Sequence, residues 1–238
     1  MCVLKYRNNK LIVIVIVIIL GMVSLMGVNL GLAKETMSTG SKIILIDAGH
    51  GGMDGGTRSK AGTLEKKINL SIAKKLKESL QKSGYEVVMT REEDMVSNLK
   101  GGTIRAKYIE DLKNRCGLKK SSNCDMLISI HLNYFEQSKY YGAQVWYSNY
   151  KDSVTLGSEI QKNLKTDLNP NNNRVPKAAK SSYRLLREYD NMPSVIVECG
   201  FLSNNEEEQK LKTEGYQDKI AVSISKSVGE FFKITTKK

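Results

Sequence analysis

The stretch LIDAGHGGMDGG, residues 45–56, carries the most information about fold and function. Its apolar start is typical of a buried β-strand, and it leads into a glycine-rich turn that holds His50, one of only two histidines among 238 residues. A glycine-rich turn after a strand can bind phosphate, whereas a histidine at the end of a strand can hold a metal ion. The flanking sequence must distinguish these two uses.

Apolar periodicity after this turn predicts an α/β fold. Apolar residues recur at helical spacing from Leu64 to Leu80, and YEVVMT (85–90) is typical of a strand. Because the segment KIILID (42–47) also predicts a strand, the order is strand, helix, strand, which favours a parallel or mixed sheet.

The same pattern continues to the end of the chain. Further predicted elements are helices near 103–118, 153–167 and 220–232 and strands at 126–131, 143–148 and 194–199. The segment 167–182 has two prolines and no apolar period, which predicts a surface loop. We therefore expect a single α/β domain with a twisted, mostly parallel or mixed sheet flanked by helices on both faces.

The N-terminal segment predicts insertion into a membrane. Three basic residues precede an uninterrupted apolar sequence at residues 11–23. The apolar character then continues to Ala33. About 20 apolar residues span a bilayer, so the segment can be a permanent anchor. The small-x-small run at 31–33 is also a cleavage signal, so the segment can be removed instead. In both cases the preceding positive charge predicts export of the remainder.

The expected domains are a signal or membrane anchor at 1–33, a tether at 34–41 and a catalytic domain at 42–235. The chain has 37 Lys and Arg against 25 Asp and Glu, and its net charge of +12 resides mainly in the exported part. This charge suits general solubility or the anionic polymers of a cell envelope. No nucleic-acid partner is expected, because no nucleic-acid-binding motif is present.

The four cysteines do not form a metal or redox motif. Cys2 precedes the apolar run, so it is not the lipidated cysteine of a lipoprotein. Cys116 and Cys124 could form a disulfide in an oxidising space, and the alternative is that they and Cys199 are buried free thiols.

Polar residues follow three predicted strands at the points where the strands end. Asp47 and His50 follow the first, His131 follows LISI, and Glu198 follows SVIV. Because sites in α/β sheets form at the carboxyl ends of strands, we expect these side chains to lie close together. With Glu65 in the first turn of the first helix, two imidazoles and one carboxylate form the ligand set of a catalytic Zn²⁺. Glu198 would then carry the proton.

The phosphate alternative does not fit the glycines. A P-loop requires a lysine followed by Ser or Thr, and a dinucleotide fold requires G-x-G-x-x-G. Here Asp54 lies between the glycine pairs, and the nearest following lysine is Lys60. A carboxylate repels phosphate, so the glycines are better explained by a backbone that folds tightly beside His50.

These residues resemble the zinc-dependent N-acetylmuramoyl-L-alanine amidases of type 3, a family of bacterial cell-wall hydrolases. The resemblance spans residues 42 to about 232. It rests on four blocks, which are IILIDAGHGGMDGGT with Glu65, MTRE (89–92), SIHLN (129–133) and IVECGFLSN (196–204).

The resemblance implies a fold, a substrate and residue roles. It places zinc ligands at His50, Glu65 and His131 and the catalytic carboxylate at Glu198. It also implies hydrolysis of the amide between N-acetylmuramic acid and the L-alanine of the peptidoglycan stem peptide. One membrane segment with one bare catalytic domain is most like the germination-specific amidases of the spore cortex.

Several features of the family remain open. The segment from His131 to Glu198 is too short for the self-blocking helix of some relatives, so we expect no internal lid. With only three protein ligands, an accessory protein that stabilises the metal site is an additional candidate partner. Where relatives commonly have Ala-Asn, this chain has Lys119 and Lys120, which we expect at a helix surface.

The residues around the predicted ligands have alternative roles. Asp47 and Asp54 are candidates to hold the second ring nitrogen of a histidine, or they form turns. Arg91 and Arg115 are each candidates for a structural ion pair or for a contact with substrate. Two alternative functions remain, a zinc peptidase that cuts within the stem peptide and a non-catalytic wall-binding protein. The second should have lost a ligand or the proton carrier, and this chain retains all four residues.

Overall fold

A computed structural model describes residues 41–95, 99–100 and 102–236. The predicted signal or anchor at 1–33, nearly all of the tether and Cys2 lie outside these residues. No helix in the described part of the chain has both the length and the apolar character needed to cross a membrane.

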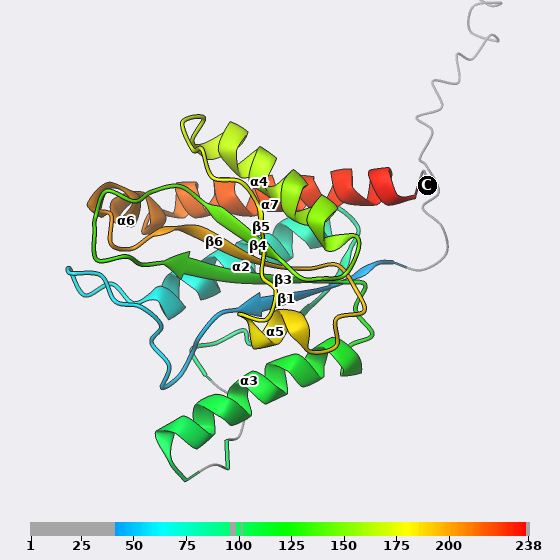
Figure 1. Ribbon diagram of the computed structural model, residues 1–238, viewed down its shortest axis with the longest axis horizontal. Helices are drawn as coiled ribbons and strands as arrows, with labels where there is room; N and C mark the ends of the chain where they lie inside the picture. The colour runs from blue at the N-terminus through cyan, green and yellow to red at the C-terminus, as the bar shows by residue number, and fades with distance from the viewer. Residues whose placement is uncertain (1–40, 96–98, 101, 237–238) are drawn as a thin grey trace, which may run out of the picture. The chain divides into compact units, whose positions relative to one another are not determined.

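Six strands form one sheet in the order β2-β1-β3-β6-β4-β5 (Figure 1). Their bounds are β1 Ile43–Ala48, β2 Glu86–Met89, β3 Met126–Asn133, β4 Gln144–Tyr147, β5 Lys177–Ala178 and β6 Ser194–Phe201. All neighbouring strands are parallel except β4 and β6, which are antiparallel. The prediction of a mostly parallel or mixed sheet is therefore confirmed.

Helices cover both faces of this sheet, as predicted. Their bounds are α2 Glu65–Lys82, α3 Ile104–Ser121, α4 Ser153–Leu168, α5 Arg184–Arg187, α6 Asn205–Leu211 and α7 Glu214–Thr235. Figure 1 shows α2, α4 and α7 on one face and α3 with α5 on the other. Because crossovers between parallel strands place helices on the faces, the central strands are buried on both sides.

Alternation along the strands divides the apolar core in two. On β1, Ile44 and Ile46 join the larger cluster beneath α2, α4 and α7, whereas Leu45 joins the smaller cluster beneath α3 and α5. On β3, Ile128 belongs to the larger cluster and Leu127 to the smaller one. This alternation explains why the strands appear in the sequence as continuous apolar runs.

Two parts of the fold differ from the sequence prediction. The expected loop at 167–182 contains the short strand β5, which pairs with Trp146 and Tyr147 at the edge of the sheet. Lys119 is buried, not at the helix surface, because its ammonium group donates to the backbone carbonyls of Leu185 and Glu188. These carbonyls near α5 replace the water that would otherwise solvate the charge.

The described cysteines are buried free thiols. Cys116 and Cys124 lie in the smaller core, and Cys199 lies in the larger core. The alternative of a disulfide between Cys116 and Cys124 is therefore wrong.

Candidate metal centre

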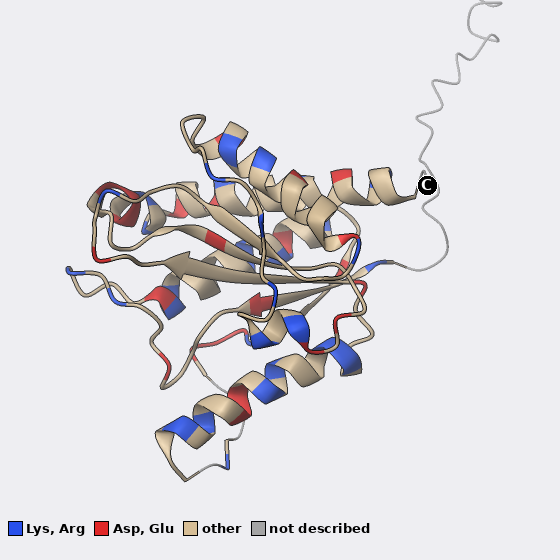
Figure 2. Cartoon of the chain, viewed as in Figure 1, with Lys and Arg blue, Asp and Glu red and all other residues tan. Residues whose placement is uncertain are grey.

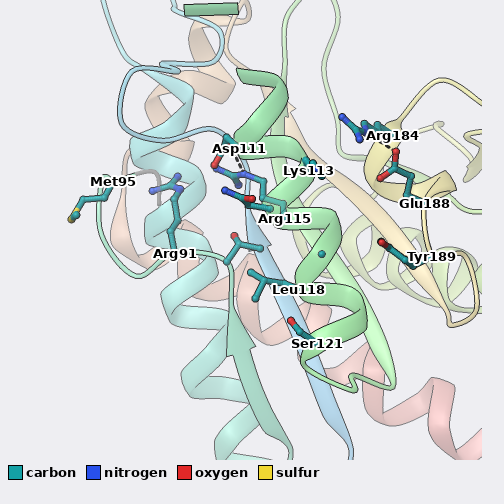
Figure 3. A pocket seen from close by; sticks show the side chains of 13 residues that line it. Arg91, Met95, Asp111, Lys113, Arg115, Leu118, Ser121, Arg184, Glu188 and Tyr189 are labelled. Carbon is teal, nitrogen blue, oxygen red and sulfur yellow. Dashed lines mark hydrogen bonds and ion pairs between the residues drawn. The ribbon is translucent and has the colours of Figure 1, made fainter. Parts of the chain in front are cut away.

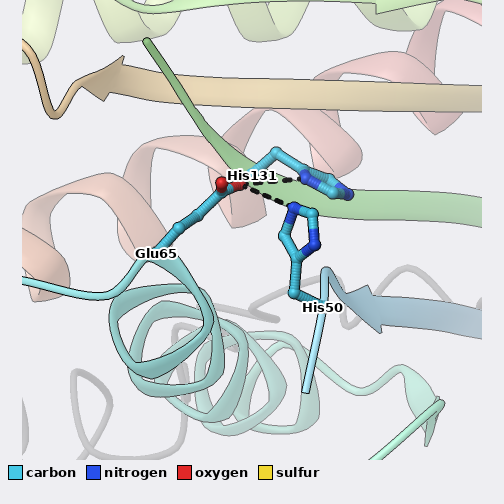
Figure 4. A group of neighbouring side chains, drawn as sticks. All are labelled: His50, Glu65 and His131. Carbon is cyan, nitrogen blue, oxygen red and sulfur yellow. Dashed lines mark hydrogen bonds and ion pairs between the residues drawn. The ribbon is translucent and has the colours of Figure 1, made fainter. Parts of the chain in front are cut away.

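The three predicted metal ligands meet at the carboxyl end of the sheet (Figure 4). His50 follows β1, Glu65 is the first residue of α2, and His131 lies on β3. His50 Nε2 lies 3.2 Å and His131 Nδ1 lies 3.1 Å from Glu65 Oε1. One ligand atom from each side chain falls within 4.8 Å of the others, so the group can hold a metal ion.

The donor set and its spacing suit zinc. Imidazole nitrogens and a carboxylate oxygen bind zinc at about 2.0–2.2 Å, so two ligands of a tetrahedral ion lie about 3.3 Å apart. The two distances to Glu65 Oε1 agree with that separation. The histidine rings are also 4.9 Å apart at their centroids and nearly perpendicular, so both fit beside one carboxylate oxygen.

Two buried arginines fix the backbone that carries His50. His50 adopts the left-handed conformation, with φ of 62°, which is uncommon for a residue other than glycine. Arg115 donates to its carbonyl at 2.6 Å, and Arg91 donates to the carbonyls of Ala48 and Gly49. Of the two roles considered for Arg115, the structural ion pair is observed, because it also pairs with Asp47 at 2.7 Å.

Glycines allow the ligand side chains to approach the backbone. A Cβ atom at Gly49 would lie 2.4 Å from the His131 ring. Gly56 has φ of +66°, and a Cβ atom there would lie 2.7 Å from both Glu65 Oε2 and the His50 ring. The prediction that glycines fold the chain tightly beside His50 is confirmed at Gly56.

The two aspartates considered as partners of the histidines differ. Asp54 Oδ2 lies 2.7 Å from His50 Nδ1, and its Oδ1 accepts from the Gly56 amide, so Asp54 both orients the ring and forms the turn, the two roles considered for it. Asp47 contacts neither histidine and accepts hydrogen bonds from Arg115, Ser129 and the Thr90 hydroxyl. Burial opposes ionisation of Asp47, but Arg115 and these hydrogen bonds lower its pKa to about 2. The predictions for Asp47 were therefore wrong.

Hydrogen bonds immobilise the Glu65 carboxylate. Oε2 accepts from the Thr57 amide and hydroxyl, and Oε1 accepts from the Leu132 amide and the Asn69 side chain. Burial alone would raise the pKa of Glu65, but its hydrogen bonds to the two histidines hold it well below the usual range. Sequence analysis missed Thr57 and Asn69, although Asn69 stands at i+4 from Glu65 on the same helix face.

The electrostatics of the cluster favour a cation. Burial disfavours the charged imidazolium, but the hydrogen bonds of His50 to Asp54 and Glu65 raise its pKa to about 10. The same negative environment stabilises a divalent metal ion bound to neutral imidazoles.

Glu198 provides a separate buried carboxyl group beside the ligands. It lies on β6 directly opposite His131 on β3, is 8% exposed, and its Oε2 atom has no hydrogen-bond partner among the described residues. Burial raises its pKa to about 7; the charge of His131 opposes this shift and that of Glu65 adds to it. The carboxyl group is thus available to exchange a proton near neutral pH.

A cavity of about 620 Å³ borders the helix α3, with Arg91 and Arg115 in its wall (Figure 3). Neither the three predicted ligands nor Glu198 lines it. Both arginines line the cavity and donate hydrogen bonds to carbonyls of the loop that carries His50. Lysine and arginine residues are also frequent along α3 (Figure 2).

Comparison with known proteins gives consistent matches over the described domain. The family model for N-acetylmuramoyl-L-alanine amidase matches residues 44–230. The germination-specific N-acetylmuramoyl-L-alanine amidase of Bacillus subtilis (strain 168) is 38% identical over 194 residues, which cover 80% of each chain.

Solved structures show the same relationship. The CwlD amidase from Clostridioides difficile, solved in complex with the GerS lipoprotein, has 45% identity and a TM-score of 0.79. The match covers 82% of this chain and all of that one. An N-acetylmuramoyl-L-alanine amidase from Clostridium difficile 630 has 34% identity and a TM-score of 0.69, with 81% and 97% of the two chains covered.

Proposed function

This chain belongs to the N-acetylmuramoyl-L-alanine amidase family and has that activity, and we propose that it acts with a zinc ion held by His50, Glu65 and His131. The observation that carries the proposal is the convergence of these three side chains beside the uncommitted carboxyl of Glu198. Peptidoglycan is the substrate, and the amide between N-acetylmuramic acid and L-alanine is the bond that is cleaved.

The proposed chemistry divides between the ion and the protein. Bound zinc supplies Lewis-acid polarisation of the amide carbonyl and makes water acidic enough to act as a nucleophile near neutral pH. Glu198 Oε2 accepts the proton of the attacking water and returns it to the departing alanine nitrogen. Asp54 holds the His50 ring through Nδ1, and Thr57 holds the Glu65 carboxylate, so neither ligand must reorganise.

A substitution at Glu198 tests the proton transfer. Glu198→Gln keeps the size of the side chain but removes its basicity, so we expect a loss of about 10²–10⁴-fold in kcat with bound zinc unchanged. Release of stem peptides from purified peptidoglycan and elemental analysis of zinc measure both quantities. Retained turnover would remove Glu198 from the mechanism.

A substitution at His131 tests the ligand set. His131→Ala should lose both bound zinc and activity, because only two protein ligands remain. Full zinc occupancy in a folded His131→Ala protein would show that the ligand assignment is incorrect.

Product analysis distinguishes the amidase from a zinc peptidase, which would share the metal and the carboxylate. Mass spectrometry of digested peptidoglycan should show intact stem peptides that begin with L-alanine, together with unsubstituted muramic acid. Fragments cut within the stem peptide would favour the peptidase.

The physiological substrate we propose is the peptidoglycan of the spore cortex. The support is the similarity to the germination-specific amidase of Bacillus subtilis. The amidase should therefore release stem peptides faster from purified cortex than from vegetative wall. Equal rates on both materials would remove the support for this specialisation.

Two further proposals concern location and partners. The N-terminal segment would export the domain and either anchor it or be cleaved, which cell fractionation and N-terminal sequencing would determine. A lipoprotein would bind the domain, since the similar Clostridioides difficile amidase was solved in complex with the GerS lipoprotein. We propose that such a partner stabilises the metal site, because only three protein ligands hold the ion. Zinc affinity measured with and without that lipoprotein tests this role.

A further inference from the structure

An aromatic cluster lies beyond the carboxyl ends of β3 and β6. The Phe135 ring stacks on Phe201 with centroids 5.7 Å apart, and Tyr140 lies 5.1 Å from Phe135. Phe201 is fully buried, whereas Phe135 is 48% and Tyr140 37% exposed. Two rings therefore face solvent while a third supports them from below. We call Phe135, Tyr140 and Phe201 the aromatic platform.

A shift in strand register places this platform on the same face of the sheet as the catalytic residues. His131 pairs with Glu198, and Asn133 pairs with Phe201, so β6 advances three residues where β3 advances two. Paired residues on neighbouring strands share a face, and residues two apart on one strand also share a face. Phe201 therefore lies on the face of His131 and Glu198. In a regular ladder Asn133 would pair with Gly200, and Phe201 would point to the opposite face.

The platform is also near the metal centre. Phe135 follows His131 by four residues, so the two Cα atoms are at most about 13 Å apart at roughly 3.3 Å per residue. This distance corresponds to a few sugar units of a polysaccharide. A glycan strand whose muramic acid lies at the metal centre can therefore reach the platform.

The chemistry of the platform favours a sugar over a peptide. A pyranose ring presents C–H groups on its faces, and these pack against the electron-rich faces of aromatic rings. An acidic stem peptide would instead require uncommitted cations. Two cations lie at the platform, and both contact its rings. The partly buried Arg174 stacks 4.4 Å above the Phe201 ring and donates through Nε to the Tyr141 carbonyl, and the Lys139 ammonium lies 5.6 Å over the Tyr140 ring.

We propose that Phe135 and Tyr140 form a binding subsite for a pyranose ring of the glycan strand, next to the muramic acid whose amide is cleaved. This inference rests on the proposed function. The subsite makes the length of the glycan a determinant of substrate preference, since a short muramoyl peptide cannot reach it.

Kinetics with substrates of different glycan length test the subsite. For Phe135→Ala and Tyr140→Ala we expect KM for polymeric peptidoglycan to rise about ten-fold, which matches the loss of one aromatic contact. The values of kcat/KM on a monosaccharide muramoyl peptide should stay within about two-fold. Tyr140→Phe, which keeps the ring, and Tyr108→Ala, which removes an exposed ring on α3, are the matched controls.

Two results would overturn the subsite. Equal losses on the polymeric and the monosaccharide substrate would assign the rings to the peptide or to folding, and unchanged KM on the polymer would assign them no role. Thermal unfolding identifies a variant that fails to fold, in which case the other alanine variant decides.

A binding measurement separates this inference from the proposed function. Calorimetry with the tetramer of β-1,4-linked N-acetylglucosamine, which contains no scissile amide, should show binding that Phe135→Ala weakens about ten-fold and Tyr108→Ala leaves unchanged. Binding by a wild-type protein that cleaves no muramoyl amide would refute the proposed function and keep the subsite. Cleavage of the muramoyl amide without binding of this tetramer would refute the subsite and keep the proposed function.

Discussion

The two faces of the sheet differ in the side chains that the same strands present to them. Beneath α2, α4 and α7 the strands present only apolar side chains to a large continuous core. Beneath α3 and α5 the apolar cluster is smaller, and toward the carboxyl ends it gives way to Asp47, Ser129, His131 and Glu198. Because side chains alternate, a residue and its neighbour in the sequence serve different faces.

Because of this difference, the apolar face contributes mainly to stability, whereas the polar face also contributes to metal binding. Apolar burial on the first face holds the sheet together without affecting charge, whereas the second face must bury charged groups and pair them. The pair formed by Asp47 and Arg115 extends that polar network to the loop of His50. Substitutions on the two faces should therefore produce different combinations of lost stability and lost metal binding.

The largest effect should come from breaking the buried ion pair. Arg115→Met leaves Asp47 without a positive partner and the His50 carbonyl without its donor. We expect a loss of about 3–5 kcal/mol in the free energy of unfolding, together with weaker zinc binding. Urea unfolding and zinc titration measure these losses. Arg105→Met, at an exposed position on α3, should change stability by less than about 0.5 kcal/mol.

A cavity on the other face should affect stability alone. Ile128→Ala removes buried methyl groups beneath α2 and should cost about 2–5 kcal/mol in the free energy of unfolding. Zinc bound per folded molecule should remain unchanged, because Ile128 lies on the face opposite His131 and the Glu65 carboxylate is held by its own hydrogen bonds to Thr57 and Leu132. Loss of zinc from the folded fraction would show that the two faces are not independent.

A smaller and purely local effect is expected at the ring of His50. Asp54→Asn removes the negative acceptor that orients the imidazole, so zinc affinity should fall about 10–100-fold with little change in stability. Competition with a chelator gives the affinity. Asp218→Asn, which disrupts an exposed ion pair with Lys75, serves as the control and should leave zinc affinity unchanged.

The pH dependence of stability should reveal the polar face as well. The pKa of Asp47 is about 2 in the folded protein and 3.8 ordinarily, so its contribution is present above about pH 4 and is lost as the pH falls toward 2. The expected contribution is about 2 kcal/mol. Between pH 5 and 2, wild-type stability should fall about 2 kcal/mol more than that of Asp47→Asn. Parallel curves would contradict the assignment to Asp47.

The sequence predicts the sheet and the ligand cluster because both follow from local patterns. Continuous apolar runs predict β1, β3 and β6, and polar residues at their ends predict a shared edge. Short elements escape this reasoning. The strand β5 has two residues and no period, and α6 is largely polar, although Asn204 caps it and Glu207 stands three residues later.

Contacts between distant segments are also beyond sequence patterns. The burial of Lys119 depends on carbonyls near α5, and the pairing of Asp47 with Arg115 depends on how α3 lies on the sheet. The register shift that aligns Phe201 with Asn133 has no signature in the sequence. Such features are set by tertiary packing, which periodicity does not encode.

The wide separation of the ligands along the chain determines when the ion can be captured. Glu65 and His131 are 66 residues apart and meet only where α2 packs against β3. An ion that needs all three side chains therefore binds the folded protein and not the unfolded chain. Its binding shifts the folding equilibrium toward the native state. Metal loading would then be a late event in maturation, and removing the ion with a chelator should lower the melting temperature without altering the path by which the sheet assembles.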